Sequence, residues 1–421
     1  MTNDKGVHNF KDLDPELCTF CGTCVGVCSQ NSLIAKDEKI YLVGECKSCE
    51  FCYNACPGRE VAFSKLNARL FESSQKERYI GVYKSIYVAY STDVKIRSNA
   101  SSGGVVTSLL IFLLDKGLID GAIVVCMKDK EPWNYEVKIA RTKTEILNAL
   151  QSKYSLVPLN AILSKIKKEE GTFALVGLPC HIHGIRKLQM IGWEHSDKIK
   201  YLIGLFCGFN MHLSATNYLI NKLGVEKGDI VSLQYRGGRY PGGFLIKTKN
   251  NNKKFLEKFY YNLLNLMYVP KRCLLCADLM NELADISVGD AWIKGIDKNG
   301  WSTVIVRTEK GEILFTEAIN HNYLGYKKIS SSDLLKSHSH LIRYKKRKVF
   351  VRLNLSKTKP IYDLETPNMR MHEYISGFLF FCLVKILTND YIKKVIGFLP
   401  LKLLGMMAYL AKYIKGRGSI E

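Results

Sequence analysis

From about residue 85 to residue 330, short apolar runs alternate with segments whose apolar residues recur at helical spacing. The runs rich in β-branched and aromatic residues predict strands at Ile86–Tyr90, Ala122–Val125, Phe173–Val176, Tyr201–Phe206, Ile230–Tyr235, Phe244–Lys247, Ala284–Val288 and Thr303–Val306. Helices are predicted at Val105–Lys116, Leu159–Lys168, His181–Gln189 and Ala215–Leu223. This alternation predicts an α/β or α+β domain over residues 85–330, with a hairpin turn at 250–252.

The first 64 residues differ, because they carry eight cysteines in two copies of the spacing CxxCxxCxxxC. Such spacing is typical of a small bacterial-ferredoxin-like domain with two [4Fe-4S] clusters, in which each motif lends its fourth cysteine to the other cluster. We therefore predict one cluster on Cys18, Cys21, Cys24 and Cys56, and the other on Cys46, Cys49, Cys52 and Cys28. Zinc sites favour paired CxxC or Cys/His sets, so they fit this spacing less well. Ser29 stands where the first motif would usually carry proline, but no ligand is lost.

Composition places this chain among globular proteins, since 47% of its 421 residues are hydrophobic and its length allows two or three domains. Its N-terminus has no apolar stretch, so no signal peptide is predicted. Fourteen cysteines without such a signal indicate reduced thiols and metal ligation in the cytoplasm. Residues 65–84 are polar and charged, which predicts a linker.

The formal net charge of +22 is concentrated in the last part of the chain, where residues 331–421 carry 17 Lys and Arg against 6 Asp and Glu, a net +11. This predicted basic helical tail opens with Arg343 and Lys345–Lys348, and it becomes apolar and aromatic from Tyr374. Its longest charge-free run, Tyr374–Val384, is too short to span a bilayer. Two interpretations stay open. The helices could lie on the inner face of a membrane or against a partner, or they could be amphipathic helices packed on the main domain. Nucleic-acid binding is not expected, because the tail shows no recognition motif.

Four later cysteines, Cys180, Cys207, Cys273 and Cys276, follow predicted strands or form a CxxC pair. Because strand ends in α/β sheets converge on one crevice, the four could hold a third [4Fe-4S] cluster. Alternatively, Cys180 and Cys207 could be small core residues, as Cys126 and Cys382 are expected to be.

Two glycine-rich segments carry further candidate chemistry. Residues 99–104 (NASSGG) precede a helix, and bare backbone N–H groups there could bind phosphate, although a serine N-cap would look the same. Residues 235–243 (YRGGRYPGG) supply arginines that could clamp phosphate or carboxylate. Lys153 could neutralise phosphate or lie near a flavin, and His181 or His183 could move a proton, but each could equally be an ordinary surface or helix-face residue.

In their order along the chain, these motifs resemble the coenzyme F-420 hydrogenase/dehydrogenase beta-subunit family, which includes 7-hydroxymethyl chlorophyll a reductase. The motifs are Ser101–Gly104, Ser152–Tyr154, Gly177–Cys180, Phe206–Gly208, Tyr235–Gly242, Cys273–Asp278 and Ala284–Asp290. The resemblance covers roughly residues 85–310, in N- and C-terminal parts that divide near 170. Two departures lie close to the expected active site: His181 replaces a usual glutamine, and Cys207–Asn210 lacks a histidine that many bacterial members carry.

The resemblance implies a bound FAD and a third [4Fe-4S] cluster on Cys180, Cys207, Cys273 and Cys276. It implies flavin contacts from Ser101, Ser102, Gly103, Gly104, Thr107 and Lys153, and, less directly, flavin or substrate contacts from Arg236, Gly237 and Asp290. Lys153, His181 and Arg236 are the candidate catalytic residues.

The expected function is that of an oxidoreductase passing electrons between a ferredoxin or another redox protein and FAD, and from FAD to an organic two-electron acceptor such as a deazaflavin. The direction could be reversed. The alternative is a non-catalytic electron-transfer subunit of a larger redox complex, docked by its basic tail.

Overall fold

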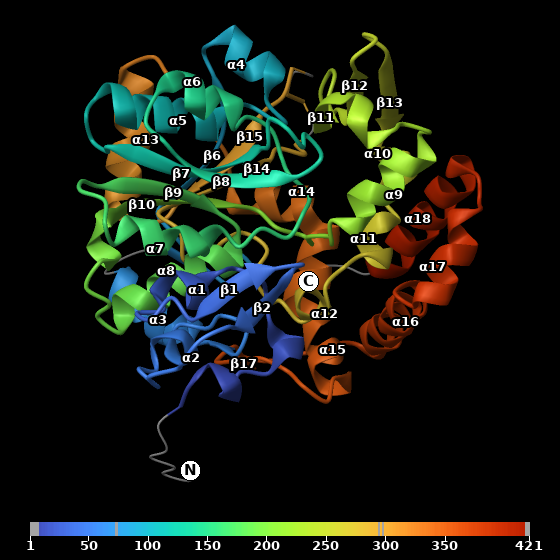
Figure 1. The fold of residues 1–421 in the computed structure, drawn as a ribbon, viewed down its shortest axis with the longest axis horizontal. Helices are drawn as coiled ribbons and strands as arrows, with labels where there is room; N and C mark the ends of the chain where they lie inside the picture. The colour runs from blue at the N-terminus through green and yellow to red at the C-terminus, as the bar shows by residue number, and fades with distance from the viewer. Residues whose placement is uncertain (1–7, 72–74, 294, 297–298, 417–421) are drawn as a thin grey trace.

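A computed structural model describes residues 8–71, 75–293, 295–296 and 299–416 of the chain. Its centre is one eight-stranded mixed sheet (Figure 1). In spatial order the strands are β16 (Leu324–Lys328), β6 (Ser85–Ser91), β15 (Ser302–Val306), β14 (Ile286–Asp290), β10 (Ile199–Leu205), β9 (Phe173–Gly177), β7 (Gly121–Met127) and β8 (Tyr135–Ala140). The pairs β14–β10, β10–β9 and β9–β7 are parallel, and the other pairs are antiparallel.

Both faces of this sheet are covered, which explains why its central strands read as continuous apolar runs. One face packs against α5 (Val105–Asp115), α6 (Lys143–Asn148) and α13 (Glu309–Asn320). The other face packs against the turn η3 (Leu159–Ile162), α7 (Leu163–Ile166) and α8 (Pro179–Met190). The helix predicted at Leu159–Lys168 is observed as a 3-10 turn followed by one short α-helix.

The N-terminal cysteine module docks directly on this second face. Its elements are η1 (Phe10–Asp12), η2 (Pro15–Leu17), α1 (Thr23–Val27), β1 (Leu33–Lys36), β2 (Lys39–Leu42), α2 (Phe51–Asn54), β3 (Glu60–Val61) and α3 (Phe63–Leu70). α1 lies so close to η3 that a Cβ on Gly26 would be 2.1 Å from the Asn160 carbonyl oxygen. The module and the sheet domain consequently share one hydrophobic core.

Residues 65–84 are more ordered than a polar linker would be. The described part of this segment holds the end of α3 and a hairpin of β4 (Gln75–Glu77) and β5 (Gly81–Tyr83). Ile80, Val82 and Tyr83 are buried there. The sequence reads as a polar linker because the few apolar residues that anchor this segment stand among many polar ones.

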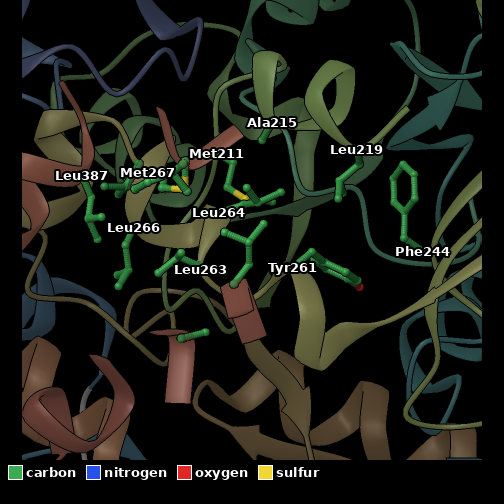
Figure 2. Packing of buried hydrophobic residues seen from close by; sticks show 14 of the residues in the cluster. Met211, Ala215, Leu219, Phe244, Tyr261, Leu263, Leu264, Leu266, Met267 and Leu387 are labelled. Atoms are coloured by element: carbon green, nitrogen blue, oxygen red, sulfur yellow. The ribbon is translucent and has the colours of Figure 1, made fainter. Parts of the chain in front are cut away.

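A second, three-stranded sheet is formed by β11 (Ile230–Gly237), β12 (Gly243–Thr248) and β13 (Lys253–Glu257). The predicted turn at 250–252 connects β12 to β13, and Asn251 adopts the left-handed conformation there, with φ of 59°. This sheet packs with α9 (Ser214–Lys222), α10 (Lys258–Tyr261) and α11 (Leu264–Met267), whose apolar side chains fill the core in Figure 2.

The predicted tail folds back onto the rest of the protein. It consists of α14 (Ser331–Ile342), a π-helical turn (Arg343–Arg347), α15 (Val349–Leu355), β17 (Ile361–Tyr362), α16 (Met371–Leu387), α17 (Asp390–Gly397) and α18 (Leu401–Gly416). β17 pairs in parallel with β3 of the cysteine module, and α16–α18 close the core beside the second sheet. The remaining helical pieces are α4 (Val94–Asn99), η4 (Ser196–Lys198), η5 (Lys227–Asp229) and α12 (Lys271–Leu274).

The basic run that opens the predicted tail packs on the rest of the protein, as the second of the two open interpretations has it, because Lys345–Lys348 are buried. Their charges are compensated inside the protein. Lys346 pairs with Glu282, and Arg347 forms two hydrogen bonds of 2.6 Å with Glu373. Buried charges are tolerable only when they are paired in this way.

Candidate redox site

The first four-cysteine group lies between η2, α1 and the end of α2. Cys18, Cys21, Cys24 and Cys56 are close enough to interact electrostatically with one another. Burial raises the pKa of Cys18 to about 12. Burial, followed by the charges of the neighbouring thiols, also raises the pKa of Cys24. Four thiolates gathered there need a cationic group between them, which iron ions would provide.

The second group lines one cavity at the edge of the module. Cys28, Cys46, Cys49 and Cys52 face it, together with apolar side chains such as Val27 and Leu42. Burial, followed by the charges of Cys49 and Cys46, raises the pKa of Cys52 to about 12. Cys28 thus lies with the second motif, and Cys56 with the first.

The third group lines another cavity, between the sheet domain and the module. Cys180 lies in the first turn of α8, Cys207 follows β10, Cys273 belongs to α12, and Cys276 follows that helix. Thr19 and Pro57 of the module line the same cavity. Cys180 also interacts electrostatically with Cys21, so the third group adjoins the first.

These groups suit a polynuclear cluster better than a single ion. Among the described residues, no set of three or more His, Cys, Asp or Glu side chains is arranged to hold one metal ion. A zinc ion would need all its ligands at about 2.0–2.3 Å. All-sulfur donor sets of four match [4Fe-4S] chemistry.

Lys345, in the π-helical turn, reaches this third cavity. It is 1% exposed and hydrogen-bonds to Cys276. Burial opposes its charge, but Cys276, Cys207 and Cys273 outweigh burial and raise its pKa. Burial also opposes the thiolate of Cys276, yet Lys345 and Arg272 lower the pKa of that thiol. Sequence reasoning missed Lys345, because nothing in a run of basic residues shows which one faces a site.

A buried pair supports the wall of the third cavity. His183 Nε2 lies 2.8 Å from Asp278 Oδ2, and Asp278 also accepts the Glu282 N–H at 3.0 Å. Phe63 of the cysteine module packs edge-on against the His183 ring. This pair therefore links α8, the CxxC segment and the N-terminal module.

The geometry argues against the proton-transfer role expected of His181. Its Nδ1 accepts the Leu178 N–H at 3.1 Å, so its Nε2 donates to the Val157 carbonyl at 3.0 Å. Burial lowers the pKa of His181 to about 4, which keeps the ring neutral at pH 7. His181 instead fixes the turn that presents Cys180.

Arg236, at the end of β11, joins several of the predicted flavin-site residues. It donates to Ser101 O at 2.7 Å and to Asp290 Oδ2 at 2.9 Å, and it approaches the Tyr154 hydroxyl at 3.3 Å. The Ser101 hydroxyl accepts the Ser152 N–H at 2.9 Å. Ser101, Arg236 and Asp290, far apart in sequence, therefore form one cluster.

The neighbouring glycines let the loop before α5 enter this cluster. A Cβ on Gly103 would lie 2.5 Å from the Ala89 carbonyl oxygen, and Gly104 has a φ of 79°. Ser102 donates to Trp301 O at 2.7 Å, and Thr107 lies buried in the first turn of α5. No side chain caps the start of α5. Uncapped backbone N–H groups at a helix start suit a phosphate group.

Lys153 and Gly237 have structural roles beside the cluster. Lys153 donates to the carbonyls of Ala149, Leu150 and Gln151 at 2.6, 2.8 and 3.0 Å, and burial lowers its pKa to about 8. Gly237 lies where a Cβ would be 2.6 Å from Gln234 Oε1. The ammonium of Lys153 is therefore already engaged, which argues against its predicted catalytic role.

Unpaired polar atoms near the cluster fit a bound organic group. The Tyr240 hydroxyl and Gln151 Oε1 are buried and have no hydrogen-bond partner among the described residues. Tyr240 lies near Gly300, which in turn approaches the Ser102 carbonyl. Buried polar atoms are rarely left unpaired, so a ligand that satisfies them is a physical fit here.

Comparison with known proteins matches three family models. Residues 11–73 match a 4Fe-4S dicluster domain, residues 86–164 the N-terminal part of the coenzyme F-420 hydrogenase/dehydrogenase beta subunit, and residues 171–332 its C terminus. The coenzyme F-420 hydrogenase subunit beta of Methanothermobacter thermautotrophicus is 36% identical over 251 residues, covering 57% of this chain and 83% of the relative. The chain belongs to the coenzyme F-420 hydrogenase/dehydrogenase beta-subunit family.

Two further relatives of this family show other contexts. A coenzyme F-420-dependent sulfite reductase of Methanocaldococcus jannaschii is 30% identical over 317 residues, covering 71% of this chain. The matched region spans 46% of that relative's length. The solved F-420-reducing [NiFe] hydrogenase complex of Methanosarcina barkeri contains a chain that is 25% identical, with a TM-score of 0.55, covering 68% of this chain and 98% of that one. The resemblance stated from the sequence motifs is confirmed, and the protein is an iron–sulfur electron-transfer protein of an oxidoreductase family.

Proposed function

We propose that this protein is an FAD- and [4Fe-4S]-dependent oxidoreductase that exchanges electrons between a ferredoxin-like protein and an organic two-electron substrate such as a deazaflavin. The observation that carries the proposal is the third cysteine cavity, which adjoins the N-terminal module on one side and lies in the sheet domain that holds the Arg236 cluster. FAD, when bound, would convert one-electron into two-electron transfer.

The chain's own residues would act as ligands, positioning groups and barriers to water. The three cysteine groups would each hold one cluster, and the Cys21–Cys180 proximity would bring the first and third together. Arg236 would hold the Ser101 loop and Asp290 in place for the flavin, while Gly103 and Gly104 allow close approach to the α5 backbone. The partly buried Tyr154 and Tyr240 would help to exclude water.

A second candidate is a non-catalytic electron-transfer subunit of a larger complex. It is favoured by the relatives, since those named hydrogenase subunit beta belong to multi-subunit enzymes. Such a subunit needs the cysteine groups, but it does not need the Arg236 cluster or unpaired polar atoms beside it. Flavin content therefore separates the two.

The test is anaerobic purification of the full chain, followed by quantification of iron, sulfide and flavin. We expect about twelve iron atoms and about one FAD per chain. Arg236→Met should lose flavin but keep its iron, whereas Arg239→Met, an exposed neighbour on the same loop, should keep both. About eight iron atoms without flavin would overturn the proposal, and full iron without flavin would favour the second candidate.

A further inference from the structure

Helix α16 is apolar on two opposite faces. Its inner face, including Phe380, Phe381 and Val384, is buried in the core beside the second sheet, where Figure 2 shows Leu387. Its outer face repeats large apolar residues at helical spacing, all of them exposed: Met371, Tyr374, Ile375, Phe378, Leu379 and Ile386. A helix that is apolar all round is normally covered all round.

The next two helices continue this outward pattern. α17 exposes Tyr391 and Val395, and Phe398, which follows its last residue, is 87% exposed. α18 exposes Leu403, Met406, Tyr409 and Leu410. In Figure 1 the three helices, coloured red, form one edge of the molecule. We call the exposed apolar residues of α16–α18 the outer helical face; contiguous apolar surfaces of this kind mark interaction sites.

Charged residues on these helices have one predominant sign at the surface. Lys385, Lys394 and Lys402 are exposed, whereas Glu373 is buried against Arg347. The exposed acid among the described residues of 371–410 is Asp390, which pairs with Lys393. The outer helical face therefore combines apolar and aromatic side chains with cationic ones.

We propose that the outer helical face docks on the surface of a bilayer containing anionic lipids. Apolar and aromatic side chains flanked by lysines are the composition of interfacial helices, and the lysines complement anionic headgroups. A protein interface would be expected to have a core depleted of lysine. No single described helix is long and apolar enough to cross a membrane, and α16 and α17, which pass that test only as a pair, are bent by 77°. Because one face of α16–α18 is packed in the core beside the second sheet, the proposal places these helices on the bilayer surface rather than across it.

This docking leaves the redox parts accessible. Figure 1 shows the N-terminal cysteine module away from the α16–α18 edge. A ferredoxin-like donor could reach the first two cysteine groups while the protein is bound to lipid. The inference does not depend on the proposed flavin, because it uses only surface residues of α16–α18.

The test is flotation of the full chain with vesicles of phosphatidylcholine, with and without phosphatidylglycerol. We expect flotation with the anionic vesicles. Ile375→Ser/Phe378→Ser/Phe398→Ser should weaken vesicle affinity about tenfold or more, since each apolar side chain loses its burial in lipid. Exchanging Lys385, Lys394 and Lys402 for Gln should weaken it roughly fivefold per lysine, and added salt should mimic this loss.

Ile313→Ser serves as the matched control, because Ile313 on α13 is 56% exposed and Ile375 is 53% exposed. It should float like the unaltered protein. The proposal is overturned if the protein does not float with anionic vesicles, or if the apolar triple variant floats equally well. It is also overturned if light scattering shows a dimer that this variant dissociates, since a second copy would then cover the face.

Discussion

The basic run at 343–348 and the outer helical face of α16–α18 invert the usual distribution of side chains. Lys345–Lys348 are buried, although lysine and arginine are almost never fully buried unless paired. A few turns later in the chain, large apolar residues such as Phe378 and Phe398 are exposed. Composition alone would have placed both sets the other way round.

The difference teaches that partners decide burial more than residue type does. Lys346 and Arg347 find carboxylates in Glu282 and Glu373, and Arg352 donates to the Leu274 and Tyr344 carbonyls at 2.6 and 2.8 Å. A π-helical turn, often found at functional sites, directs this run inward. The outer helical face has no such partner within the described chain, which is why a lipid surface is its proposed cover.

The largest expected effect comes from shortening one phenylalanine on each face of α16, which tests whether one face is buried and the other exposed. Phe380 is 1% exposed and Phe378 is 48% exposed. Phe380→Ala should lower the free energy of unfolding by about 3–5 kcal/mol, because it leaves a cavity. Phe378→Ala should change it by less than about 0.5 kcal/mol. Anaerobic urea denaturation measures both, and equal losses would contradict the assignment of inner and outer faces.

A smaller effect is expected from comparing two ion pairs, one in each region. Glu373→Gln removes the charge that Arg347 meets in the interior and should cost about 2–3 kcal/mol of unfolding free energy. Asp390→Asn breaks the exposed pair with Lys393 and should cause no measurable change. Thermal denaturation of both variants beside the unaltered protein checks this.

The effect of Glu373 should depend on pH. Burial opposes its charge, but hydrogen bonds from Arg347 and the Arg370 N–H outweigh burial and lower its pKa. The stabilisation is therefore complete above the unfolded pKa of about 4.3 and is lost as the pH falls through the lower folded pKa. The difference between Glu373→Gln and the unaltered protein should stay constant from pH 7 to about 5 and shrink below that. A difference that grows on acidification would contradict this account.

Local patterns predicted the strands and the cysteine motifs well. The run Tyr201–Phe206 lies almost entirely in β10, and Thr303–Val306 lies in β15. Such signals are local, because alternation or spacing within a few residues specifies them. β8 and β16 were not predicted, since they lie at the sheet edges and are partly exposed. The strand order, in which β6 lies between β16 and β15, depends on long-range packing.

Site roles were harder to predict than site membership. Ser101, Arg236 and Asp290 meet as their shared resemblance implied, but sequence could not show that Lys153 caps the carbonyls after α6 or that backbone groups occupy both nitrogens of His181. Each of these roles depends on neighbours that only the fold supplies. Flavin binding, the third cluster and the physiological substrate stay predictions.

The smallest expected effect tests what one buried cation does for the third cysteine group. Lys345→Met removes a positive charge beside Cys276 and should lower the midpoint potential of a cluster held there, because the reduced form carries more negative charge. We expect about a tenfold change in the reduction equilibrium, or about 59 mV for one electron.

Two variants serve as controls. Lys345→Arg keeps the positive charge and should retain the potential. Lys348→Met is the matched control, since Lys348 is buried in the same run and the opposite charge acting on it is that of Glu373. Redox titration followed by electron paramagnetic resonance measures the shift, with Cys180→Ser identifying the signal. An unshifted potential in Lys345→Met with that signal intact would show that the buried charge serves stability alone, whereas a missing signal in the unaltered protein would instead refute the third cluster.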